Sequence, residues 1–275
     1  TSGAEAADGT GVGGAFAITV ADNVTTAAIG TGTELDITGD LGATATHHGE
    51  STTTADGTAL GADAAIGAAI ALAFVDDSAT ATTARDITAD GAVGFAADGD
   101  GKSAVLAKAS AEGADKDDET AEGNTTADDQ KSKQTSAANS KSGDGDAVGQ
   151  TADDGSGGSV SVAAALAVNV SESEASASVG AVTIVAGDGG TGSLSLAASN
   201  NMDASAIADG SAATGDGGTA VGIAVAINVA TMTNEAVVGG GATVTADGMS
   251  ASALMKDVDS DEKHDFAAKA TSGAS

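Results

Sequence analysis

The segment Val221-Gly-Ile-Ala-Val-Ala-Ile-Asn-Val229 alternates strictly between β-branched residues and small or polar ones. In an extended chain, Val221, Ile223, Val225, Ile227 and Val229 point to one side, and Gly222, Ala224 and Ala226 point to the other. This pattern predicts a β-strand. A helical bundle is the disfavoured alternative despite the abundant Ala, because β-branched residues at period 2 fit a pleated strand.

The same pattern recurs at 12–20, 66–74 and 162–170. Anchor residues of the four segments are spaced 54, 94 and 61 residues apart, and they are Ile18, Leu72, Leu166 and Ile227. After each segment a second strand is expected to begin, at Ile29, Thr83, Val179 and Val238. A short third element follows, at 36–38, 86–88, 183–185 and 243–245. Repetition on this scale is typical of a solenoid. We therefore expect an all-β parallel β-helix, a β-solenoid of stacked coils built from units of roughly 55–60 residues.

The expected geometry follows from the length of the unit. A unit of this size suits two or three coils of about 20–25 residues each, stacked about 4.8 Å apart in parallel register. About a dozen coils would make a rod on the order of 60 Å long. Only four Phe supply aromatic rings, and Trp, Tyr and Pro are absent. The core must therefore be thin and built from small side chains.

Residues 1–275 are read as a single elongated solenoid with an acidic, Ser/Thr-rich insertion at about 98–158. This stretch, with runs such as Asp128-Asp-Gln-Lys-Ser-Lys133, breaks the repeat. Two interpretations stay open, a continuation of the solenoid with a poor core and a protruding loop. The chain begins and ends within repetitive sequence, so we expect a piece of a longer protein.

Acidic residues dominate the charge. Forty Asp and Glu against ten Lys and Arg give a formal net charge of −30, which argues against nucleic acid or anionic membranes as partners. Much of the Asp lies beside Gly, as in turns on a salt-adapted surface. The alternative is Ca²⁺ bound between turns, because calcium prefers carboxylate and carbonyl oxygens. The candidate calcium ligands are Asp98, Asp100, Asp144, Asp146, Asp188 and Asp216.

No arrangement of residues indicates catalysis, and we expect that the protein is not an enzyme. His47 and His48 are expected in an exposed turn; on a strand they would face opposite ways and could not share a metal ion. A polysaccharide-cleaving β-helix needs basic and aromatic residues along its groove, and this chain has a single Arg and no Trp or Tyr.

The small-residue face of the repeated strands is the candidate site for self-association. A solvated strand face carries Thr, Lys or Glu, and these positions are almost all Ala or Gly. Two alternatives remain: a loop or the insertion of the same chain covers this face, or the face packs flat against another subunit. An ice-binding face would need regular Thr rows. The face consists of Ala15, Ala17, Ala69, Ala71, Ala73, Ala163, Ala165, Ala167, Gly222, Ala224 and Ala226.

The run at 221–248, from V-G-I-A-V-A-I-N-V to A-T-V-T-A-D-G, resembles repeats of very large secreted bacterial exoproteins, the filamentous-haemagglutinin-like adhesins and related giant surface proteins. This resemblance implies a right-handed parallel β-helix, export to the cell surface, and a role in adhesion or matrix building. The run from Ala206 to Gly215 also resembles head repeats of trimeric autotransporter adhesins, which implies a left-handed β-roll.

These observations favour a structural protein, a protomer or segment of an extracellular or cell-surface fibre, sheath or adhesive filament. Its expected partner is itself, through stacked coils and the Ala/Gly face, with Ca²⁺ as a possible cofactor. The alternative is an adhesin module that uses the 98–158 insertion to bind a ligand on a host or neighbouring cell.

Overall fold

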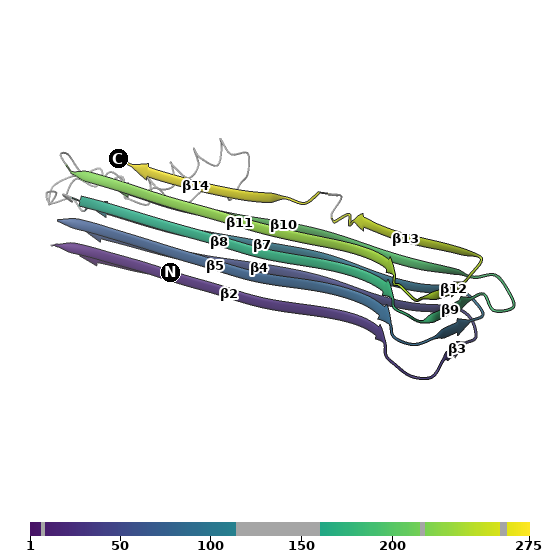
Figure 1. Ribbon diagram of the computed structural model, residues 1–275. Helices are drawn as coiled ribbons and strands as arrows, with labels where there is room; N and C mark the ends of the chain where they lie inside the picture. Colours follow the sequence, from purple (N-terminus) through teal and green to yellow (C-terminus); the bar gives the residue numbers. More distant parts are fainter. Residues whose placement is uncertain (7–8, 114–159, 215–217, 259–262) are drawn as a thin grey trace.

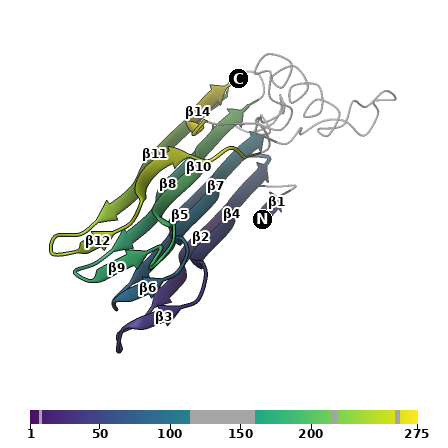
Figure 2. The ribbon, with the colours of Figure 1, turned by 90° about the vertical axis from the view of Figure 1, so that its right-hand side faces the viewer.

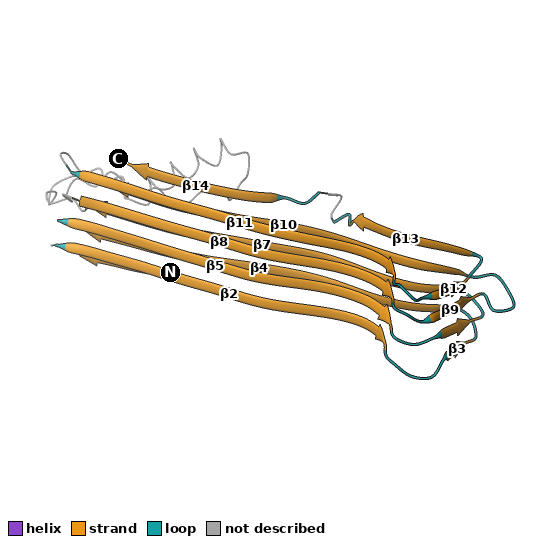
Figure 3. Cartoon of the chain, viewed as in Figure 1, coloured by secondary structure: helices purple, strands orange, loops and turns teal. Residues whose placement is uncertain are grey.

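The computed structural model describes residues 1–6, 9–113, 160–214, 218–258 and 263–275. These residues form fourteen β-strands and no helix (Figure 3). Accordingly, no helix that could cross a membrane occurs in this part of the chain. The all-β class expected from the alternating segments is confirmed.

Each repeat unit forms one coil made of a long strand, a short strand and a second long strand. The first coil contains β2 (Thr10–Ile29), β3 (Leu35–Ile37) and β4 (Leu41–Gly61). The others are β5 (Ala64–Thr83), β6 (Ile87–Ala89) and β7 (Val93–Gly113); β8 (Val160–Val179), β9 (Thr183–Ala186) and β10 (Ser193–Ala213); and β11 (Thr219–Val238), β12 (Thr243–Thr245), β13 (Gly248–Met255) and β14 (Phe266–Ala274). A short strand, β1 (Ser2–Ala6), pairs with the end of β4.

Successive coils stack as three parallel sheets. In Figure 1 the coils lie one above another, with β2 lowest and β5, β8 and β11 above it, and Figure 2 views the stack obliquely from the end that carries the short strands β3, β6, β9 and β12. Sheet A has the order β1-β4-β7-β10-β13, with β14 also paired to β10; sheet B has the order β11-β8-β5-β2; and sheet C has the order β12-β9-β6-β3. The pairing keeps repeat positions aligned, so that Ile18 lies beside Leu72, Leu72 beside Val168, and Val168 beside Ile227. The predicted anchor of the third unit was wrong by two residues, because Leu166 lies beside Ile70 and Val225 instead. The parallel β-solenoid expected from the repeats is confirmed.

The expected subdivision of the unit is wrong. Each unit is one coil rather than two or three, and the described residues form four coils rather than a dozen. The alternating segments continue through polar residues to the ends of 20-residue strands, and Ile29 and Thr83 end strands instead of beginning new ones. At about 3.3 Å per residue such a strand is about 65 Å long, so the long dimension follows the strands rather than the stacking axis.

Sheets A and B pack face to face over a core of small side chains. Ala69, Ala71 and Ala73 of β5 are fully buried, as are Ala163 and Ala167 of β8. Small side chains let the two sheets approach more closely than the ~10 Å usual for packed sheets. The expectation of a core of small residues holds for this cluster. It is wrong for the second cluster, next to sheet C, where the side chains of Phe95, Ile87, Ile184, Leu194 and Leu196 are at most 1% exposed.

The sheets come closest where β4 turns into β5. A Cβ atom added to Gly57 would lie 1.9 Å from the carbonyl oxygen of Ala68, and one added to Gly11 would lie 1.9 Å from that of Leu60. Neither position has room for any side chain. Glycine at these positions therefore sets how thin the solenoid can be.

The boundary of the insertion differs from the prediction. Residues 98–113 belong to β7, which pairs along its whole length with β4 and β10. Residues 114–158 of the predicted insertion lie outside the described residues. The stretch joins β7 to β8, and β8 resumes the same register, since Ala64 lies beside Val160 as Thr10 lies beside Ala64.

Candidate functional site

The predicted Ala/Gly face lies inside the solenoid. In the two central coils, Ala69, Ala71, Ala73, Ala163, Ala165 and Ala167 are at most 3% exposed, because sheet A of the same chain covers them. Of the two alternatives left by the sequence, cover within the chain is the one observed, and the covering element is the opposite sheet rather than a loop. The prediction that a second subunit docks onto these six residues is therefore wrong.

The end coils differ from the central ones. Ala15 and Ala17 of β2, and Gly222, Ala224 and Ala226 of β11, occupy the same rows but are only partly buried. Among the described residues no further coil covers their outer side, and the edge of the core is accessible there. The two ends of the stack thus expose part of the small-residue core predicted from the sequence.

The strands at these ends also have free edges. β2 and β11 are the outermost strands of sheet B, and each pairs with a described strand on one side only. Both are 20 residues long, and the chain has no Pro to block further pairing. Solenoids that end in water usually carry a capping repeat with a polar outer face. No described residue caps either end of sheet B.

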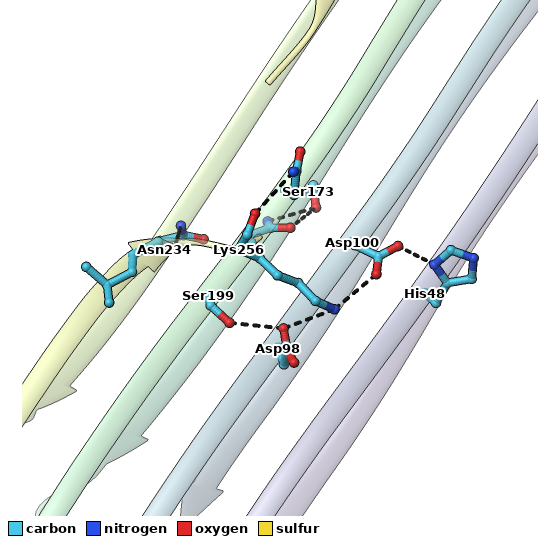
Figure 4. A network of polar contacts seen from close by, with 10 residues as sticks. His48, Asp98, Asp100, Ser173, Ser199, Asn234 and Lys256 are labelled. Atoms are coloured by element: carbon cyan, nitrogen blue, oxygen red, sulfur yellow. Dashed lines mark hydrogen bonds and ion pairs between the residues drawn. The ribbon is translucent and has the colours of Figure 1, made fainter. Parts of the chain in front are cut away.

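Two of the predicted calcium ligands, Asp98 and Asp100 of β7, belong to a polar network on the outer face of sheet A (Figure 4). The Nζ atom of Lys256, which follows β13, lies 3.1 Å from Asp98 Oδ1 and 3.0 Å from Asp100 Oδ2. His48 Nδ1 also bonds to Asp100, and Ser199 Oγ donates to Asp98 Oδ1 at 3.0 Å. An ammonium group thus occupies the position between these carboxylates where a cation would bind.

This network shifts two pKa values. Burial alone would raise the pKa of Asp100, but hydrogen bonds from Lys256 and His48 outweigh it, and the pKa is lowered. For Lys256, burial would lower the pKa, and the hydrogen bonds that its ammonium group donates to Asp100 and Asp98 raise the pKa instead. Both shifts favour the charged forms of the pair. The main-chain N–H of Lys256 also donates to the carbonyl oxygen of Asn200 in β10 at 3.0 Å, so Lys256 links the last coil to the third and second coils across sheet A.

The remaining calcium candidates do not form a cluster with these two. Asp188 is exposed in the turn after β9, and Asp144, Asp146 and Asp216 lie outside the described residues. No group of three His, Cys, Asp or Glu side chains suited to a metal ion occurs in the described part of the chain.

His47 and His48 lie on β4 rather than in the turn expected from the sequence, and they face opposite sides as adjacent strand residues must. His48 is on the outside, whereas His47 points between the sheets. There His47 Nε2 lies 3.1 Å from Asp77 Oδ1, and His47 Nδ1 lies 3.1 Å from the Thr25 hydroxyl. Asn23 donates to the same Asp77 oxygen at 2.8 Å.

These residues are part of a polar band that divides the core into two apolar clusters. Further along the stack, Ser103 donates to Asn169 at 2.7 Å, and Asn169 donates to Asn228 at 3.1 Å. Asn200 and Ser173 bond to each other across the two sheets. The hydroxyl–imidazole–carboxylate chain of Thr25, His47 and Asp77 is therefore a link between strands within the core.

No family model, curated protein or solved structure matches the chain. The resemblance to exoprotein repeats therefore stays a prediction.

Proposed function

We propose that this protein is structural and non-enzymatic, a segment of an extracellular or cell-surface filament that grows by stacking further coils on both ends. The single observation that carries the proposal is the open state of the two ends. Free 20-residue edges on β2 and β11 lie beside a partly exposed Ala core.

An added coil would pair with one of these edges and bury the exposed rows in the same step. The burial of the equivalent Ala residues in the central coils, where a coil lies on each side, supports this proposal. The added coil belongs either to a longer version of this chain or to another copy. The net charge of −30 keeps the lateral surfaces hydrated while the ends join.

Electron microscopy of the purified chain across a concentration series tests the proposal, first with calcium and then with excess chelator. We expect filaments whose oriented fibres diffract at about 4.8 Å along the fibre axis, the spacing between stacked strands. If the chelator disperses the filaments, calcium is required for assembly. If the filaments persist in chelator, calcium is not required. Short particles at every concentration would contradict stacking between copies of this chain.

A pair of variants separates end stacking from other association. Ala224→Lys places a charge on the inner side of the free strand β11, where a further coil must pack. Thr233→Lys adds the same charge to the outer side of the same strand. We expect Ala224→Lys to abolish filaments and Thr233→Lys to preserve them, with the strand content of both checked by circular dichroism. Loss of filaments in both variants would count against the ends as the site of growth.

A further inference from the structure

The outer face of sheet B carries an unbroken apolar surface. The side chains that alternate with the buried Ala residues point to solvent, and five successive rows across four strands contain no polar residue. Those that are largest and most accessible have exposed fractions of 38–74%. The apolar face consists of Val12, Gly14, Phe16, Ile18, Val20, Ile66, Ala68, Ile70, Leu72, Phe74, Val162, Ala164, Leu166, Val168, Val170, Val221, Ile223, Val225, Ile227 and Val229.

The outer face of sheet A is different in character. In β4 its outward positions include Thr44, Thr46 and Thr52, and in β7 they include Asp98, Asp100 and Lys102. Only one side of the slab is therefore solvated in the way a monomeric protein requires. With strands about 4.8 Å apart and residues about 3.3 Å apart, the apolar face covers on the order of 600 Å². That is the upper end of what monomeric soluble proteins expose.

We propose that the apolar face of sheet B docks against the same face of a second copy, forming a two-fold, face-to-face sandwich. Two such faces bury on the order of 1,200 Å² together, which reaches the range of stable interfaces. The face is apolar and free of charge, so its chemistry is complementary to itself, as a two-fold contact requires. Association of this kind is lateral and does not depend on the stacking of coils proposed above.

The arrangement of charges fixes the orientation of the two copies. The apolar rows end at an acidic row of Asp22, Asp76 and Glu172, which lie beside one another in register. If facing strands ran in the same direction, the two acidic rows would oppose each other. With a two-fold axis along the stacking direction, facing strands run antiparallel and the acidic rows lie at opposite ends. The centre of the face, around Ile70 and Leu166, then meets its own copy.

Other occupants fit less well. An anionic membrane is repelled by a chain with a net charge of −30. The chain's own segment 114–159 contains Val148 as its one aliphatic residue larger than Ala, so it offers little apolar surface to match. A second copy supplies a surface of the same size and chemistry.

Sedimentation analysis of a matched pair of variants tests the proposal. Leu166→Glu places a charge at the centre of the apolar face on β8, and Leu106→Glu makes the same change on the outer side of β7 in sheet A. We expect the wild type and Leu106→Glu to sediment at multiples of two chains of 25.5 kDa, and Leu166→Glu to lose the lateral partner while retaining its strand content. Added NaCl should strengthen the wild-type association by screening the repulsion between acidic chains.

Cysteine cross-linking tests the orientation, since the chain has no natural Cys. Under mild oxidation, Leu166→Cys should form covalent dimers and Glu172→Cys, on the same strand, should not. The reverse result would overturn the antiparallel arrangement. A wild type that stays at the mass of one chain, or a Leu166→Glu variant as associated as Leu106→Glu, would overturn lateral docking altogether. Monomers that co-sediment with zwitterionic vesicles would assign the face to lipid instead.

The two proposals fail independently. Loss of filaments in Ala224→Lys with cross-linking intact at Leu166→Cys leaves lateral docking standing. Filaments that persist in Leu166→Glu leave end stacking standing, with each filament reduced in width.

Discussion

The Nε2 atom of His47 lies 3.1 Å from Oδ1 of Asp77, and this contact joins sheet A of the first coil to sheet B of the second. Asp77 is buried, and it also accepts a hydrogen bond from Asn23 of the first coil. One carboxylate therefore satisfies two polar side chains inside the core.

Removing that carboxylate should destabilise the solenoid strongly. Asp77→Ala leaves His47 and Asn23 without their shared acceptor, and we expect a loss of about 3 kcal/mol in the free energy of unfolding. Asp76→Ala removes the neighbouring carboxylate, which points outward, and should change stability by less than about 0.5 kcal/mol. Chemical denaturation of both variants measures the difference. Equal effects would show that the internal contact contributes nothing specific.

The close approach of the sheets predicts a strict requirement for glycine. Gly57→Ala forces a Cβ atom into the backbone of Ala68 and should cost at least about 3 kcal/mol, the upper range for overpacking. Gly42→Ala lies on the same strand, where nothing lies within 4 Å of the added Cβ, and it should be neutral or stabilise by about 0.5 kcal/mol. Thermal unfolding compares the two variants. If Gly57→Ala unfolds at the same temperature as the wild type, the sheets can separate at this end without loss of stability.

The buried carboxyl group of Asp209 should make the stability of the fold depend on pH. Burial raises the pKa of this carboxyl, against a hydrogen bond from Ser211 and the charges of Lys108 and Lys269, and its Oδ2 atom has no hydrogen-bond partner among the described residues. The folded state therefore favours the protonated form more than the unfolded chain does. Its stabilising contribution is complete below the pKa of the unfolded chain and is lost as the pH rises through the folded pKa.

Asp209→Asn should accordingly be more stable than the wild type at neutral pH, by about 1 kcal/mol. The advantage should shrink towards acidic pH, where the wild-type carboxyl is protonated in both states. Denaturation curves across the pH range provide the measurement, with Asp188→Asn in an exposed turn as the control. An advantage that is independent of pH would point away from the charge as its cause.

The Lys256 network predicts a second pH profile. The lowered pKa of Asp100 gives stability that is present above the usual Asp value and is lost as the pH falls through the folded pKa. The raised pKa of Lys256 gives stability that is present below the usual Lys value and is lost as the pH rises through the folded pKa. Stabilisation by the pair is therefore greatest between these limits.

Lys256→Met should lose about 1 kcal/mol at neutral pH, because the pair is partly exposed and screened by solvent. The loss should fall at both pH extremes and at high salt. Lys102→Met removes the same charge from an exposed position on β7 and serves as the control. Matching losses in the two variants would attribute the effect to overall charge rather than to the network.

Some of these features were accessible from the sequence and others were not. Alternation at Ile66 to Phe74 predicts a strand, and its recurrence predicts the stacked register. The same strand continues to Thr83 through Asp76, Ser78 and Thr80, which are typical of loops in isolation. The length of the strands was missed for that reason, and with it the number of coils.

Which face of each strand points into the core was harder to predict from the sequence. Val221 and Gly222 alternate in the same way whichever of them faces inward, and large aliphatic residues normally take the core. In the half of the core lined by Ala69 and Ala163, the close spacing between the sheets decides, because only small side chains fit there and at Gly57 even a Cβ atom does not. The internal position of His47 depends on the same long-range pairing, and no local pattern marks it.

The join between β7 and β8 has a consequence for how such chains diversify. Elsewhere the passage from sheet A to sheet B is short, with Gly61 ending β4 and Ala64 beginning β5, yet residues 114–159 separate β7 from β8 without shifting the register of the following coil. The entropy of closing such a loop grows only slowly with its length. Each corner of the stack is thus a place where new sequence can be inserted and selected for binding while the rows on either side stay unchanged. The stacked coils and the sequence inserted between them can therefore evolve separately.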